Sequence, residues 1–234
     1  DAVRVSILMM APQGLDIHFK EERLEQGRNF MNKLWNCSRF ILMNLDDNLE
    51  LDLSQLDLSN LDSTDKWILC KLNSIIKDID DSLANYKIND AVKKIYNFVW
   101  GDYCDWYIEF SKSRIYGSSD DERRKVLSIA VYVLKNILKL FHPFAPFITE
   151  EIWSFLDNNE LLAKSPYPEI VSEFNFSKEE EDIDLFKMVI TSIRNIKSNL
   201  GVSPKKEITI YCRGEQSKTA VINNNKHHLL QLVN

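Results

Sequence analysis

The sequence predicts an all-α fold: a helix bundle of about five helices with a small truncated α/β appendix at its C-terminal end. Glycine and proline are scarce, at six each in 234 residues, so long helices with few tight turns are expected. Apolar residues recur at helical spacing in several long segments. The hydrophobic fraction of 44% and the charged fraction of 27% are typical of a folded soluble protein with an exposed helical surface.

The first segments lead into the bundle. Residues 1–10 are apolar and are expected to close a helix that belongs to a preceding region. Pro12 and Gly14 end that helix, and residues 15–20 form a short extended connector. An amphipathic helix then covers residues 28–45, because its apolar and polar side chains separate onto two faces at about 100° per residue.

Four further helices complete the predicted bundle. A polar loop separates the first helix from a second at residues 63–85. Asn89 is the candidate N-cap of a third helix that runs to about Ile115. A fourth helix, at about residues 122–140, ends at two prolines, and a fifth follows through Trp153.

The last third of the chain changes character. Residues 158–175 are expected to form a loop, and Ser177 with Glu180 forms a capping box for a helix that ends near Gly201. Residues 208–211 alternate like a strand, and residues 229–233 resemble the start of another. The chain therefore divides into three parts. Residues 1–20 are the end of a preceding region with its connector, residues 21–165 are the helical bundle, and residues 166–234 are the linker with the appendix.

The first amphipathic helix carries the most informative surface. Five polar side chains align on one of its faces: Asn29, Asn32, Lys33, Asn36 and Arg39. Phe40 falls in the middle of this polar stripe. An aromatic ring among amides and cations suits nucleic-acid binding, because a base can stack on the ring while donors recognise its edge. The alternative is that another helix covers Phe40 and that the stripe is ordinary surface.

Three blocks of sequence support a family resemblance. They are RNFMNKLWNCSRF at residues 28–40, NFVWGDYCDWYIE at 97–109 and HPFAPFITEEIW at 142–153. In this order and spacing they resemble the anticodon-binding domain of the valyl-tRNA synthetase family. The third block is shared by related class I synthetases, and the first two are more specific to the valine enzymes. The resemblance covers most of the chain up to about Pro204.

The resemblance implies that a complete enzyme joins valine to its tRNA with ATP and Mg²⁺, and that the anticodon is an identity element. The residues expected to bind tRNA are Lys33, Arg39 and Phe40, with Asn29, Asn32 and Asn36 as second choices. The chain lacks the class I signature His-x-Gly-His, and residues 111–113 match only the last part of a Lys-Met-Ser-Lys-Ser loop. We therefore expect a fragment without catalytic residues, bound metal or cofactor of its own.

Other residues that could form a catalytic or ligand-binding site are more simply explained by structural roles. Asp102, Asp105 and Glu109 would share a helix face, but acidic faces with partners such as Lys112 are ordinary. Trp100, Tyr103, Trp106 and Tyr107 are expected to pack in the bundle, and His142 to satisfy the backbone at the end of the fourth helix. The four cysteines have no zinc-binding spacing and are expected to be reduced and mostly packed.

Two alternatives stay open. The same module occurs in isoleucine, leucine and methionine enzymes, against which the first two blocks argue. The second alternative is a helical scaffold that binds proteins, which the formal net charge of −6 favours slightly because an acidic surface repels phosphates. No signal peptide and no membrane-length apolar run is found. We expect a cytoplasmic monomer that binds tRNA and neither a membrane nor DNA.

Overall fold

The structure is a computed structural model that describes residues 1–10, 14, 19, 21–45, 53, 56–117, 119–157, 160–203 and 206–233. In this part of the chain the ordered elements are α-helices with short 3-10 turns and one π-helical segment, and no strand occurs. In chain order they are α1 (Ala2–Met10), α2 (Glu22–Asn44), η2 (Leu58–Asn60), α3 (Ser63–Ala84), α4 (Ile88–Asn97), η3 (Phe98–Tyr107), α5 (Ile108–Gly117), α6 (Asp120–Phe141), α7 (Pro146–Ser154), η4 (Leu162–Lys164), α8 (Ser177–Asn199), α9 (Gln216–Asn224) and α10 (Lys226–Val233).

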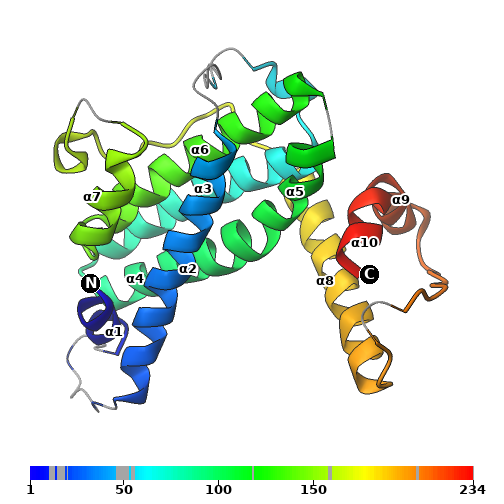
Figure 1. Cartoon of the computed structure of the whole chain (residues 1–234), viewed down its shortest axis with the longest axis horizontal. Coiled ribbons are helices and arrows are strands. Elements are labelled where there is room, and N and C mark those ends of the chain that lie inside the picture. Colours follow the sequence, from blue (N-terminus) through cyan, green and yellow to red (C-terminus); the bar gives the residue numbers. More distant parts are fainter. Residues whose placement is uncertain are drawn as a thin grey trace.

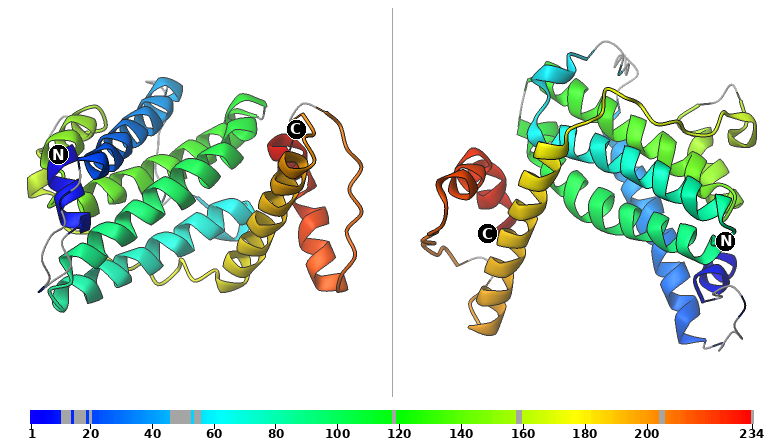
Figure 2. Two further views of the ribbon diagram at one scale, coloured as in Figure 1. Left: turned by 90° about the horizontal axis from the view of Figure 1, so that it is seen from below. Right: turned by 180° about the vertical axis from the view of Figure 1, so that it is seen from behind.

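The predicted all-α class is confirmed. Helices α2 to α7 pack around one hydrophobic core, and the N-terminus lies on the opposite side of the molecule from α9 and α10 (Figures 1 and 2). Phe30 of α2 is completely buried in this core, with its ring centroid 4.8 Å from that of Tyr96 and 5.2 Å from that of Phe141. Within the described residues, no helix is both long enough and apolar enough to traverse a lipid bilayer.

Helix α1 is fastened to the bundle through a close approach to α2. Gly27 makes the approach possible: a Cβ atom there would lie 2.2 Å from the Ser6 hydroxyl and 2.3 Å from the Ala2 carbonyl oxygen. Asp1 also accepts a hydrogen bond from the backbone N–H of Ile148 at 2.7 Å. The expected connector at residues 15–20 lies outside the described residues except for residue 19, and so do residues 46–52, 54 and 55 of the polar loop expected between Leu45 and Asp62.

A buried ion pair joins α3 to α5. Asp65 is completely buried and accepts two hydrogen bonds from the Arg114 guanidinium, at 2.9 and 2.6 Å, and a third from the Tyr107 hydroxyl at 2.9 Å. Arg114 also donates to Glu122 of α6 at 2.8 and 2.5 Å. This network connects three helices through charge-assisted hydrogen bonds in the interior, where such bonds are strongest.

Three predicted end contacts are wrong, although the helices themselves are present. Lys87, not Asn89, is the N-cap of α4; Asn89 instead donates to the carbonyl oxygens of Leu8 and Met9 at the end of α1. The N-cap of α8 is Phe176, and its side chain makes no cap. His142 contacts the Thr149 hydroxyl at 2.8 Å rather than the end of α6. Asn89 and His142 each contact a residue of another helix, although the local sequence predicted a role at the end of their own helix.

The α/β character predicted for the appendix is also wrong within the described residues. Residues 208–211 form no strand, and residues 229–233 belong to α10. A strand needs a neighbour to take its backbone hydrogen bonds, and the structure offers none here. Helix α10 docks on α8 instead: Arg194 donates to the carbonyl oxygen of Leu232 at 2.9 Å. The predicted division into three domains stays a prediction.

Candidate nucleic-acid interface

Helix α2 presents the predicted polar stripe to solvent. Phe30, Leu34 and Ile41 on its inner face are completely buried. On the outer face, four of the five polar stripe residues are exposed, namely Asn29, Asn32, Asn36 and Arg39. The helical period therefore separates an apolar face that holds α2 in the bundle from a row of amide donors and one guanidinium.

Lys33 differs from the rest of the stripe because the protein already holds its charge. Its ammonium group pairs with the Asp105 carboxylate and lies 5.4 Å from the ring centroid of Trp100. Partial burial acts to lower the pKa of Lys33, but the hydrogen bond and charge of Asp105 outweigh it and raise the pKa. Lys33 thus stays protonated, and a phosphate would have to compete with Asp105 for it.

Phe40 is neither fully exposed nor part of the main core interior. Its ring packs edge-on against Tyr116, with centroids 6.3 Å apart, and the Lys112 ammonium group lies 5.8 Å from the ring centroid. Beneath it lies a small apolar cluster of Ile115, Val126 and Leu127. The end of α5 therefore covers part of the ring, as the alternative interpretation proposed, while the ring keeps a half-buried environment beside a cation.

The fold adds a cleft that the sequence did not reveal. It lies between α2 and the end of α7 and has a volume of about 290 Å³. Its lining residues are mostly apolar and come from both helices: Trp35, Ser38, Arg39, Leu42, Met43, Ile152 and Phe155. Trp35 is 38% exposed. Phe155 lies edge-on to it at 6.4 Å between centroids. No periodic signal could pair residues so far apart in the sequence.

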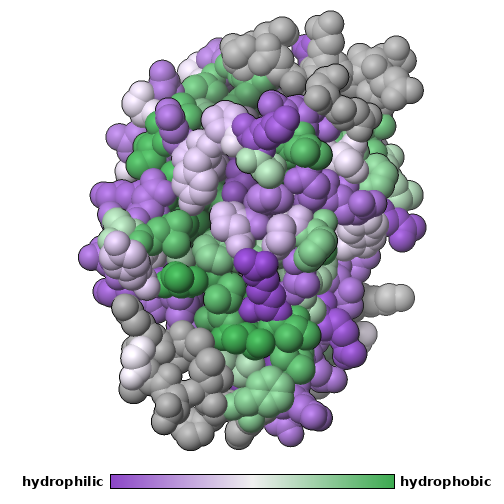
Figure 3. Space-filling model, turned by 90° about the vertical axis from the view of Figure 1, so that its left-hand side faces the viewer, coloured by the Kyte–Doolittle hydropathy of each residue, from purple (hydrophilic) through white to green (hydrophobic). Residues whose placement is uncertain are grey.

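The surface around α1 and α7 is mixed rather than uniformly polar. Figure 3 views this side of the molecule, where apolar side chains are interspersed with hydrophilic ones. Val3 and Phe147 are 54% and 79% exposed.

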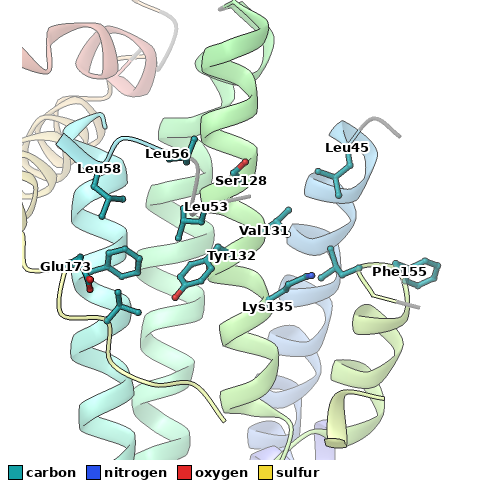
Figure 4. A pocket seen from close by; sticks show the side chains of 13 residues that line it. Leu45, Leu53, Leu56, Leu58, Ser128, Val131, Tyr132, Lys135, Phe155 and Glu173 are labelled. Carbon is teal, nitrogen blue, oxygen red and sulfur yellow. The ribbon is translucent and has the colours of Figure 1, made fainter. Parts of the chain in front are cut away.

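A second hollow is less suited to nucleic acid. It has a volume of about 780 Å³ and lies beside the end of α2 and one face of α6 (Figure 4). Leucine, valine and phenylalanine side chains dominate its lining, and its polar side chains are Ser128, Tyr132, Lys135 and Glu173. One cation among apolar walls is a poor site for a phosphate backbone, so we assign it no part in RNA binding.

The three carboxylates of the second sequence block are each engaged by a lysine. Asp105 pairs with Lys33 of α2, Asp102 pairs with Lys187 of α8 at 2.6 Å, and Glu109 pairs with Lys112 at 2.5 Å. The partner predicted for Glu109 is therefore present. The first two pairs join η3 to α2 and α8, and the third lies within α5, so each carboxylate has its own lysine partner.

Comparisons with known proteins identify a family and relatives of this chain. Residues 65–212 match the family described as anticodon-binding domain of tRNA ligase. A valine–tRNA ligase of Geobacter sulfurreducens is 39% identical over 99% of this chain and 26% of its own length. Those of Fusobacterium nucleatum and Bacillus subtilis are 40% and 36% identical over 88% and 94% of this chain, and 24% and 25% of their own lengths. The chain thus spans about a quarter of these curated relatives.

The fold has a solved counterpart. The crystal structure of a LeuRS–tRNA–LeuAMS ternary complex from Agrobacterium radiobacter K84 superposes with a TM-score of 0.55 and 19% identity. The match covers 74% of this chain and 20% of that one. At this identity the likeness concerns the fold alone. The family match covers more than half of the sequence, and by it this chain belongs to the family of anticodon-binding domains of tRNA ligases.

Proposed function

We propose that this chain is the part of a valine–tRNA ligase that grips the anticodon arm of the valine tRNA, and that it does so with the outer face of α2. Its family membership and its valine–tRNA ligase relatives support the role. The observation that carries the choice of face is the position of Arg39. It is exposed, it lines the α2–α7 cleft, and it adjoins Phe40 in the sequence.

Arg39 can serve two unpaired bases. A base in the α2–α7 cleft would pack against Trp35 and Phe155, with the guanidinium fork at the rim to recognise its edge. A neighbouring base would stack over Phe40, whose ring already carries a cation beside it. Asn36, one turn earlier on the same face, offers an amide that both donates and accepts hydrogen bonds.

The charge distribution sets the expected strength of binding. The formal net charge is −6, so attraction of phosphates must come from local cations. Lys33 is paired with Asp105, and Lys112 is paired with Glu109. The carboxylate partner partly neutralises each of these lysines and so weakens its attraction for a phosphate. We therefore expect few phosphate contacts, and base stacking together with Arg39 accounts for most of the discrimination.

The proposal extends to the whole protein through the relatives. We propose that this protein is a cytoplasmic, monomeric valine–tRNA ligase, that ATP and Mg²⁺ act in a catalytic region outside this chain, and that the chain itself binds neither a membrane nor DNA. Charging assays on the complete enzyme with valine, isoleucine, leucine and methionine distinguish this proposal from the related class I enzymes.

The decisive experiment compares two arginines. The 234-residue chain is titrated with a valine tRNA transcript and with the same transcript carrying an altered anticodon. Arg39→Ala should lose most of the preference between the two. Arg213→Ala, an exposed arginine in the segment between α8 and α9, removes the same charge at a distance and should retain the preference. Equal binding of both transcripts by the unaltered chain, or no binding at all, would favour a protein-binding scaffold.

A further inference from the structure

Three side chains with metal-ligating atoms meet at the junction of α3 and α10. Asp62 is the N-cap residue of α3, and His227 and His228 lie in the first turn of α10. One donor atom from each residue lies within 4.8 Å of the others. Helix α10 reaches this position because it packs against α8 and α5 at the far side of the bundle (Figure 1).

His228 is buried without a hydrogen-bonding partner. Its side chain is 0% exposed, and neither Nδ1 nor Nε2 forms a hydrogen bond with any described residue. Nε2 lies 3.8 Å from an Asp62 carboxylate oxygen, and the ring packs 4.9 Å from the Phe110 centroid. Buried polar groups in folded proteins almost always have a hydrogen-bonding partner or a ligand, so the unpartnered imidazole of His228 indicates a binding site.

The charges around the cluster also favour a cation. Asp62, Asp65 and Glu122 surround Arg114, and all three lie within 3.9 Å of its guanidinium group. Three carboxylates face one guanidinium in this largely buried network. Lys125 adds a positive charge at the surface, 3.9 Å from Glu122. The carboxylates on the interior side of the cluster therefore outnumber the two cations beside them.

We propose that Asp62, His227 and His228 bind one divalent transition-metal ion of the Zn²⁺ type. Two imidazole nitrogens and a carboxylate oxygen are ligands that zinc accepts, and a water molecule would complete a four-coordinate site. The donor atoms must move closer together, to about 3.4 Å apart in a tetrahedral site. His227 is exposed and can turn to close this distance.

The proposed site lies between two helices that are far apart in the sequence. The metal would connect the N-terminal end of α3 to α10 and so hold the last two helices on the bundle.

The test is a titration of the 234-residue chain with Zn²⁺, followed by calorimetry, on a Cys212→Ser background. Cys212 is an exposed free thiol and would otherwise bind zinc on its own. We expect one site per chain. His227→Ala and Asp62→Asn should each weaken binding by about tenfold or more. Asparagine still caps a helix, so the second variant keeps α3 intact. Lys226→Ala, an exposed neighbour in α10, is the matched control and should bind like the parent.

A second readout separates this site from adventitious binding. Hydrogen exchange of the α10 amides should slow when Zn²⁺ is added to the parent and remain unchanged in His227→Ala. Zinc binding that His227→Ala does not weaken, or no binding on the Cys212→Ser background, would overturn the proposal. The cluster shares no residue with the polar stripe of α2, so this result is independent of tRNA binding.

Discussion

Replacement of Arg114 by methionine should be one of the most damaging single changes in this chain. Arg114 supplies two of the three hydrogen bonds that Asp65 accepts. Without them a completely buried carboxylate retains only the Tyr107 hydroxyl. Breaking a buried ion pair from one side typically costs about 3–5 kcal/mol. Glu122 adds little to this figure because its side chain is 32% exposed and water can replace the guanidinium.

This loss is large on the scale of the whole domain. A free energy of unfolding of about 5–15 kcal/mol is typical, so a loss of about 3–5 kcal/mol in Arg114→Met removes at least about a fifth of it. At this chain length the melting temperature should fall by roughly 6–20 °C. Urea denaturation followed by circular dichroism measures the change. Arg124→Met is the control: its pair with Asp121 is exposed on both sides, and the expected loss is below about 1 kcal/mol.

The pH dependence gives a second check on the same variant. Burial raises the pKa of Asp65 against the lowering effect of Arg114, so removing Arg114 should raise that pKa further. An acid with a higher pKa in the folded state binds protons more tightly there, so stability falls as pH rises between the unfolded and folded pKa values. Arg114→Met should therefore be less destabilising at about pH 5 than at about pH 7. A loss no larger than in Arg124→Met, or one that does not shrink on acidification, would refute the reasoning.

Four further predictions concern the core, the stripe, the α1 contact and catalysis. Leu34→Ala should lose about 2–5 kcal/mol of stability because Leu34 is fully buried. Phe40→Ala should lose less stability than Leu34→Ala, but about 1–3 kcal/mol of tRNA affinity. If the two variants had equal melting temperatures and Phe40→Ala kept its anticodon discrimination, Phe40 would be a core residue. The logarithm of tRNA affinity should fall with that of salt concentration by roughly 0.7 per phosphate contact, with a shallow total slope, and salt-independent binding would contradict the proposed interface. Gly27→Ala should cost about 1–3 kcal/mol because its Cβ meets Ser6 and Ala2, while Gly101→Ala, with open space around it, should be neutral or stabilising in the same denaturation assay. The chain alone should show no valine-dependent exchange of pyrophosphate into ATP, and exchange in a pure preparation would show that it carries a catalytic site.

The local patterns predicted the helices well because a helix is a local structure. The second helix was expected at residues 63–85 and occurs at Ser63–Ala84; the fourth was expected at about residues 122–140 and occurs at Asp120–Phe141. Both have a wide buried stripe that periodicity detects. The same reasoning failed at Asn89, whose amide reaches the end of α1, a partner 80 residues away in the chain.

In the candidate site, too, the features of a single helix could be predicted from the sequence, and the contacts between helices could not. The outward direction of Asn32, Asn36 and Arg39 follows from the helical period alone. The pairing of Lys33 with Asp105 and the cover of Phe40 by Tyr116 depend on how separate helices pack, so the sequence could not predict them. Their roles in tRNA binding stay predictions.

The π-helical segment η3 determines the angular phase of the helices on either side of it. Each π turn holds more residues than an α turn, because its hydrogen bonds run from i to i+5. The ten residues of η3 therefore rotate the buried face of α5 relative to that of α4. In this arrangement Tyr107 faces Asp65 of α3. Asp105 and Asp102 reach lysines of α2 and α8. Deleting one residue here, for example Gly101, would keep the segment helical but shift that rotation by about 100°. The chain would lose the alignment of its ion pairs without losing a single helix.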